Sequence, residues 1–120
     1  MKIPFLDSLR QWSTLPRKMI FIEDDGFRRS CKGLLDDEGL FALMEWLAVR
    51  PGAGKVIPGS GGLRKLRWAA KGHGKRGGAR VIYFWWISDE KILLLDIYGK
   101  GEQENLSADE IKQLKRKILP

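Results

Sequence analysis

Residues 92–98 are nearly all apolar, and this run constrains the fold more than any other stretch of the chain. A strand with apolar side chains on both faces is expected at the centre of a sheet that is covered on both sides. The preceding residues 79–87 are rich in aromatic and β-branched side chains, which favour a second strand. The polar residues 88–91 turn the chain between the two runs, so the two strands are expected to be neighbours.

A third strand is predicted over residues 63–69, where apolar and basic residues alternate imperfectly. Successive side chains of a strand point to opposite faces, so Leu66 and Trp68 share one face, and Lys65 and Arg67 share the other. This pattern is typical of a strand that is buried on one face only. A long glycine-rich hairpin loop follows it and leads into the next strand.

Three helices are predicted from capping residues and from apolar residues that recur at helical spacing. Asp36 or Asp37 can cap the longest of them, which a Pro-Gly pair ends. Ser107 and Glu110 form a capping box in front of a basic amphipathic helix near the C-terminus. A short helix is predicted over residues 27–34.

A short apolar run over residues 18–23 predicts one more strand, which ends at the turn signal Asp24-Asp25-Gly26. The order of elements is then strand, helix, helix, three strands, helix. It predicts an α+β fold with an antiparallel sheet as its core, the helices packed on one face and the first strand added at one side. The glycine- and proline-rich residues 51–62 are interpreted as an irregular connection.

A chain of 120 residues suits a single domain, since two halves would each be too small to bury an adequate core. We assign residues 19–120 to that domain and residues 1–18 to an N-terminal extension. No apolar run approaches the length of a membrane span, and polar residues and prolines interrupt the region where a signal peptide would have its apolar core. A cytoplasmic protein that does not enter a membrane is therefore expected.

Cysteine and histidine are too scarce for several kinds of site. Cys31 is the one cysteine, which excludes a disulfide within the chain and a cysteine-based zinc site, and no metal site is predicted. His73 is the one histidine. It leaves a Ser/His/Asp or Cys/His hydrolase formally open, but no nucleophile-elbow motif accompanies it.

The net charge of +7 is concentrated in one region of the chain. No acidic residue lies between Glu45 and Asp89, whereas nine lysines and arginines do, and the rest of the chain holds more acidic than basic residues. Scattered lysines usually indicate a solvated surface, but a long basic tract without acids indicates a site for a polyanion.

Three blocks of sequence, in the same order as the predicted strands, resemble the HigB branch of the RelE-type toxins. They are GGLRKLR at residues 61–67, GxGKRGGxRVIY at residues 72–83 and IYGK at residues 97–100. A weaker similarity extends the resemblance over about residues 19–118. Several motifs in one order are far more specific than a single glycine motif.

The resemblance implies the toxin of a type II toxin-antitoxin system, with a microbial-ribonuclease-like RelE fold and a cognate antitoxin that carries a helix-turn-helix domain. It implies an endoribonuclease that cuts mRNA on the ribosome without a metal or another cofactor, and so inhibits translation. In such cleavage the 2′-hydroxyl of RNA attacks the adjacent phosphate. The enzyme must align the scissile group and stabilise the negative charge that develops on the phosphate oxygens.

The catalytic residues that the resemblance implies are cationic. Arg80 matches the arginine that the family places at the scissile phosphate, and a guanidinium can hold two phosphate oxygens at once. Lys65 and Arg67 resemble the family's basic pair, which contacts the substrate and can include the proton acceptor. Lys100 matches a family lysine. Ordinary surface cations are the alternative interpretation of Lys65, Arg67 and Arg80.

A second group is expected to contact mRNA or ribosomal RNA and consists of Arg64, Lys71, His73, Lys75, Arg76 and Tyr98. In the glycine-rich loop the backbone can approach a phosphate closely, although a solvated hairpin tip is an alternative. Arg64 should point away from the face of Lys65 unless the strand bulges. His73 could also donate a proton to the leaving 5′-oxygen, and Tyr98 could instead belong to the core.

The resemblance is incomplete after the last strand. Gly101 stands where some RelE toxins have a catalytic arginine, and Leu106-Ser107 replaces a tyrosine that some of them use for base stacking. Either the HigB branch distributes the work differently or this chain is a weaker nuclease. Two other functions stay open, namely a ParE-like toxin that inhibits DNA gyrase and a noncatalytic module that binds RNA or DNA.

Overall fold

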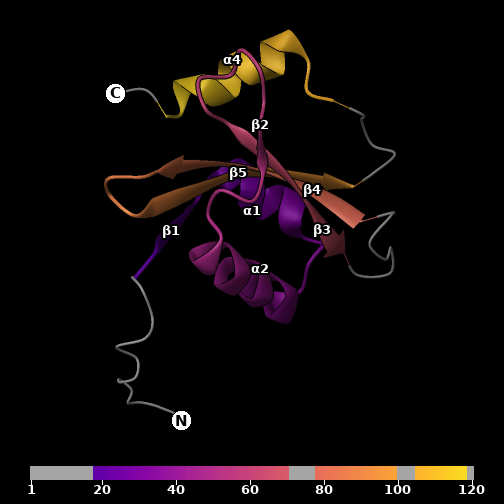
Figure 1. The fold of residues 1–120 in the computed structure, drawn as a ribbon. Helices are drawn as coiled ribbons and strands as arrows, with labels where there is room; N and C mark the ends of the chain where they lie inside the picture. The colour runs from indigo at the N-terminus through magenta and orange to yellow at the C-terminus, as the bar shows by residue number, and fades with distance from the viewer. Residues whose placement is uncertain (1–17, 71–77, 100–104, 119–120) are drawn as a thin grey trace.

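The computed structural model describes residues 18–70, 78–99 and 105–118. In these ranges three helices pack on a five-stranded sheet with the strand order β1-β5-β4-β3-β2 (Figure 1). The strands are β1 (Ile20–Glu23), β2 (Lys55–Val56), β3 (Arg64–Ala70), β4 (Gly78–Trp86) and β5 (Lys91–Gly99). The helices are α1 (Asp25–Cys31), α2 (Asp37–Val49) and α4 (Ala108–Arg116). The α+β class that the sequence predicts is confirmed.

The sheet is mixed rather than wholly antiparallel. β2, β3, β4 and β5 form antiparallel pairs in turn, whereas β1 runs parallel to β5. The predicted antiparallel core of β3, β4 and β5 is therefore confirmed, and β1 lies at an edge of the sheet as expected. Two helices and three strands separate β1 from β5 along the chain, so no short hairpin forces the two to run in opposite directions.

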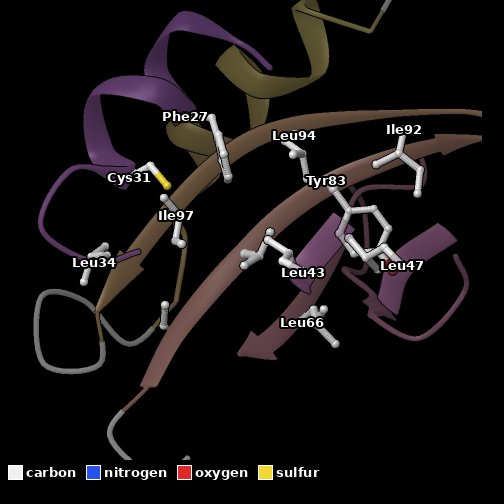
Figure 2. Packing of buried hydrophobic residues seen from close by; sticks show 12 residues of the cluster. Phe27, Cys31, Leu34, Leu43, Leu47, Leu66, Tyr83, Ile92, Leu94 and Ile97 are labelled. Carbon is white, nitrogen blue, oxygen red and sulfur yellow. The ribbon is translucent and has the colours of Figure 1, made fainter. Parts of the chain in front are cut away.

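The core has two parts, one on each face of the sheet. The first cluster joins the sheet to α1 and α2 and includes Phe27, Leu43 and Leu94 (Figure 2). The second cluster joins the other face to α4 and includes Ile82 and Leu114. Figure 1 shows the corresponding layers, with α4 above the sheet and α2 below it.

The prediction that the helices pack on one face is therefore wrong. The physical reason lies in β5, whose neighbouring residues Leu93 and Leu94 are both buried, one in each cluster. A strand that is apolar on both faces loses hydrophobic stabilisation unless both faces are removed from water. In this fold α4 supplies the second cover.

The two longer helices begin at the capping residues that the sequence indicates. Asp36 caps α2, because its side chain accepts a hydrogen bond from the Gly39 N–H at 2.7 Å. Ser107 caps α4, and both hydrogen bonds of the predicted capping box with Glu110 are formed. None of the helices in the described residues has the length and apolar character needed to cross a membrane.

Two short elements differ from the predictions. Asp24 accepts a hydrogen bond from the Gly26 N–H at 2.9 Å and caps α1, so the Asp24-Asp25-Gly26 sequence begins a helix rather than a turn. The helix consequently spans Asp25–Cys31 instead of residues 27–34. β2 lies within the segment interpreted as irregular, and a strand of two residues is too short to show an alternating pattern.

A salt bridge connects the C-terminal end of α4 to the start of α1. The Lys117 Nζ lies 2.7 Å from Asp24 Oδ2. Burial by itself raises the pKa of Asp24, but the hydrogen bonds from Lys117 and from the Gly26 N–H outweigh it, so the pKa lies below its usual value. The charged carboxylate is therefore favoured in the folded state.

Replacing Lys117 with Met tests this connection. Because the folded pKa of Asp24 is lowered, its stabilisation is present above the unfolded pKa of about 4 and is lost as the pH falls through the folded value. The Lys117 side chain is 41% exposed, so we expect Lys117→Met to lower the free energy of unfolding by only about 0.5 kcal/mol at neutral pH.

Urea titrations near neutral pH and below about pH 3 measure this difference, which should shrink in acid. Lys112→Met removes an exposed lysine of the same helix and is the matched control. A loss that is equal at both pH values, or equal to that of the control, would contradict the role of the ion pair.

Candidate functional site

A pocket of about 660 Å³ lies where β2, β3 and β4 meet the segment before α4. The described residues that line it are Ala53, Lys55, Lys65, Leu66, Arg67, Arg80 and Asn105. Four of these side chains are cationic and none is acidic, so the described part of the lining attracts anions. Part of the basic tract of the sequence therefore lines a concave surface.

The pairing of β3 with β4 brings three of the predicted catalytic residues together. Arg67 lies directly opposite Arg80, and Lys65 lies directly opposite Ile82. Directly opposite residues of an antiparallel pair project from the same face, and Ile82 belongs to the cluster under α4. The predicted shared face of Lys65 and Arg67 is confirmed, and Arg80 shares it. Their roles in catalysis stay predictions.

Arg80 has a buried nitrogen that is not hydrogen-bonded. Among the described residues its Nη1 finds no partner, and the hydroxyl of Tyr98, directly opposite on β5, finds none either. An unmet buried donor costs about 1–3 kcal/mol, and more if the group is charged. An anionic oxygen at this point would give the guanidinium the partner that it lacks.

Tyr98 lies in the core rather than on the surface, because only 4% of the residue is exposed. Burial raises the pKa of its phenol, and the neighbouring Arg80 guanidinium offsets part of that rise. The tyrosine therefore stays neutral under ordinary conditions and can donate a hydrogen bond. Its location favours the core alternative for its main role, although its hydroxyl lies beside the pocket arginine.

Lys65 is held by a residue that the sequence did not single out. Its Nζ donates a hydrogen bond of 3.0 Å to Asn105 Oδ1, and both residues line the pocket. Lys55 was also missed, because it lies on the unpredicted strand β2, directly opposite Lys65. A strand prediction at residues 55–56 would have placed Lys55 in the site, but no local pattern connects Asn105 with Lys65.

Arg64 projects from the opposite face of β3, as expected without a bulge. Its Nη1 donates hydrogen bonds to the Gly52 and Gly54 carbonyl oxygens at 3.1 and 2.7 Å. Its guanidinium carbon lies 5.9 Å from the centroid of the Trp85 ring. Arg64 therefore stabilises the turn before β2, and the structure does not bring it together with Lys65, Arg67 and Arg80.

Tyr83 stabilises the same turn through two hydrogen bonds of its hydroxyl. Its hydroxyl donates to the Pro51 carbonyl oxygen and accepts from the Gly54 N–H, both at 2.8 Å. Burial raises the pKa of this phenol too. A Cβ added at Gly54 would lie 2.9 Å from the Tyr83 ring, so glycine permits the close approach. This turn holds Ala53 and Lys55 at the wall of the pocket.

Several predicted site residues fall outside the residues that the structure describes. These are Lys71, His73, Lys75, Arg76 and Lys100, and most of the predicted N-terminal extension falls outside as well. No family model matches the chain. The relation of the pocket to RNA chemistry therefore depends on the sequence motifs and on the geometry of Lys65, Arg67 and Arg80.

Replacing Tyr83 with Phe tests how the pocket wall is held. The change removes two hydrogen bonds and leaves the buried Gly54 N–H without its acceptor, so we expect a loss of about 1–3 kcal/mol in the free energy of unfolding. Tyr98→Phe is the matched control, since that hydroxyl has no partner among the described residues. Urea-induced unfolding measures both. Equal losses in the two variants would refute the assigned role of Tyr83.

Proposed function

We propose that this protein is a toxin of the HigB branch of the RelE type, which cuts mRNA on the ribosome without a metal. The observation that carries the proposal is the pocket on β3 and β4. Its described lining holds four cations and no acid, and the buried Arg80 nitrogen has no hydrogen-bond partner among the described residues. Two of the three family motifs extend onto these strands, and the third includes the last residues of the neighbouring strand β5.

The proposed reaction is an attack of the RNA 2′-oxygen on the adjacent phosphorus. The bond from phosphorus to the 5′-oxygen breaks, which leaves a 2′,3′-cyclic phosphate and a 5′-hydroxyl. One proton leaves the attacking 2′-hydroxyl and one is gained by the departing 5′-oxygen. Negative charge grows on the nonbridging oxygens during the attack, so cations fixed in advance lower the barrier.

In this proposal Arg80 binds the nonbridging oxygens. Its guanidinium can hold two oxygens in one plane, and its position opposite Arg67 adds a second positive charge to the same face. Lys65 and Lys55 are directly opposite each other and add to the field along the backbone of the RNA. Both core clusters contain residues of β4, and this packing on both faces favours the preorganised site that such a role requires.

The partners in this proposal are the ribosome with its mRNA and a cognate helix-turn-helix antitoxin. They are implied by the family resemblance. The basic pocket supports the RNA partner directly, because affinity for nucleic acids depends chiefly on contacts between cations and phosphates. Some relatives have an arginine where this chain has Gly101. In this chain the pocket cations would therefore supply more of the charge stabilisation.

Mapping of cut sites in a translated mRNA tests the function. Wild-type protein should cut the message on ribosomes, Arg80→Ala should slow cleavage by about 10²- to 10³-fold, and Lys65→Ala by at least about tenfold. Lys32→Ala, which removes an exposed charge at the end of α1, is the control for net charge.

Each alternative predicts a different outcome. An intact message together with inhibited gyrase would indicate a ParE-like toxin, and RNA binding without cleavage would indicate a noncatalytic module. Normal cleavage by both pocket variants would reject the assigned site.

A further inference from the structure

We propose that Asn105 is a positioning residue of the pocket, whose side-chain amide holds the Lys65 ammonium where it can act on the same RNA backbone as Arg80. This inference deepens the proposed function and rests on it. It concerns a contact between residues 40 positions apart, in which Lys65 Nζ donates to Asn105 Oδ1 at 3.0 Å.

A lysine at this position needs such a contact to stay in place. Its side chain has four rotatable bonds and loses considerable entropy when it is fixed. Lys55 lies directly opposite on β2, and two like charges opposite each other on one face repel. Without a restraint, Lys65 is expected to turn away from Lys55 and to leave the pocket for much of the time.

An amide is the suitable restraint, because it accepts a hydrogen bond without neutralising the charge. A carboxylate at position 105 would also hold the ammonium, but it would cancel the positive charge and repel the phosphate. Asn105 therefore orients Lys65 and leaves its charge available to RNA. The described lining of the pocket includes no acid, which agrees with a restraint that leaves the charge of Lys65 in place.

Asn105 can hold a flexible partner because the residues that follow it pack against the sheet. The next residue, Leu106, packs against the cluster under α4. Ser107 then caps α4, and its N–H donates to Glu110 Oε1 at 2.8 Å while its hydroxyl accepts from the Glu110 N–H at 3.1 Å. The burial of Leu114 anchors α4 to the sheet. The packing of α4 on the sheet therefore keeps Asn105 close to Lys65 on β3.

A double-mutant cycle tests the proposal with two readouts. One is cleavage of a translated mRNA, and the other is binding of an oligoribonucleotide that cannot be cut because its scissile nucleotide is 2′-deoxy. Asn105→Ala should weaken both by about three- to tenfold in the wild-type background and should have no further effect in Lys65→Met. Thermal denaturation should show the same midpoint for Asn105→Ala as for wild type.

Two further substitutions distinguish positioning from a general structural role. Asn105→Asp should bind the oligonucleotide less well than Asn105→Ala, because the carboxylate neutralises the ammonium. Asn105→Gln should recover part of the loss, because it keeps an amide acceptor. Independent effects of Asn105→Ala and Lys65→Met, or an Asn105→Asp variant that behaves like wild type, would overturn the proposal.

The two readouts also separate this inference from the proposed function. If wild-type protein binds the oligonucleotide but does not cut mRNA, the nuclease proposal fails, and the binding cycle still decides the role of Asn105. If wild-type protein cuts mRNA and the two substitutions act independently, only the positioning role fails. A wild-type protein that neither binds nor cuts RNA would overturn both.

Discussion

Strand β5 is buried on both faces, and the layers of the fold follow from this burial. Leu94 faces α1 and α2, and Leu93 belongs to the cluster under α4. A sheet with such a central strand requires a third layer, and the C-terminal helix provides it. The same helix brings Asn105 to the edge of the pocket, so the cover that completes the core also completes the candidate site.

The second determinant is the register of β3 against β4. It places Arg67 opposite Arg80, and β2 adds Lys55 opposite Lys65. Pairs of like charges on one face destabilise a sheet, and a buried guanidinium nitrogen without a partner adds to that cost. A protein retains such an arrangement when a ligand of opposite charge offsets the cost on binding. The polyanion predicted from the acid-free tract fits this requirement.

The sequence predicts the features that depend on local chemistry. The caps at Asp36 and Ser107 and the shared face of Lys65 and Arg67 follow from spacing alone, and the structure confirms them. The apolar residues 92–98 indicate that both faces of the sheet are covered, but spacing does not say which helix covers which face, so the prediction that the helices pack on one face is wrong. Long-range contacts cannot be predicted from spacing for the same reason. Asn105, for example, meets Lys65 only because α4 packs across the sheet.

We expect the pocket around Arg80 to bind the phosphates of RNA. Nitrogen-15 NMR of the arginine side chains, recorded while an uncleavable 2′-deoxy-substituted RNA is added, tests it most directly. Arg64 is the internal control, because its guanidinium is hydrogen-bonded to Gly52 and Gly54 on the opposite face. The guanidinium signals of Arg80 should shift on titration, and those of Arg64 should stay unchanged. Shifts at Arg64 without shifts at Arg80 would contradict this expectation.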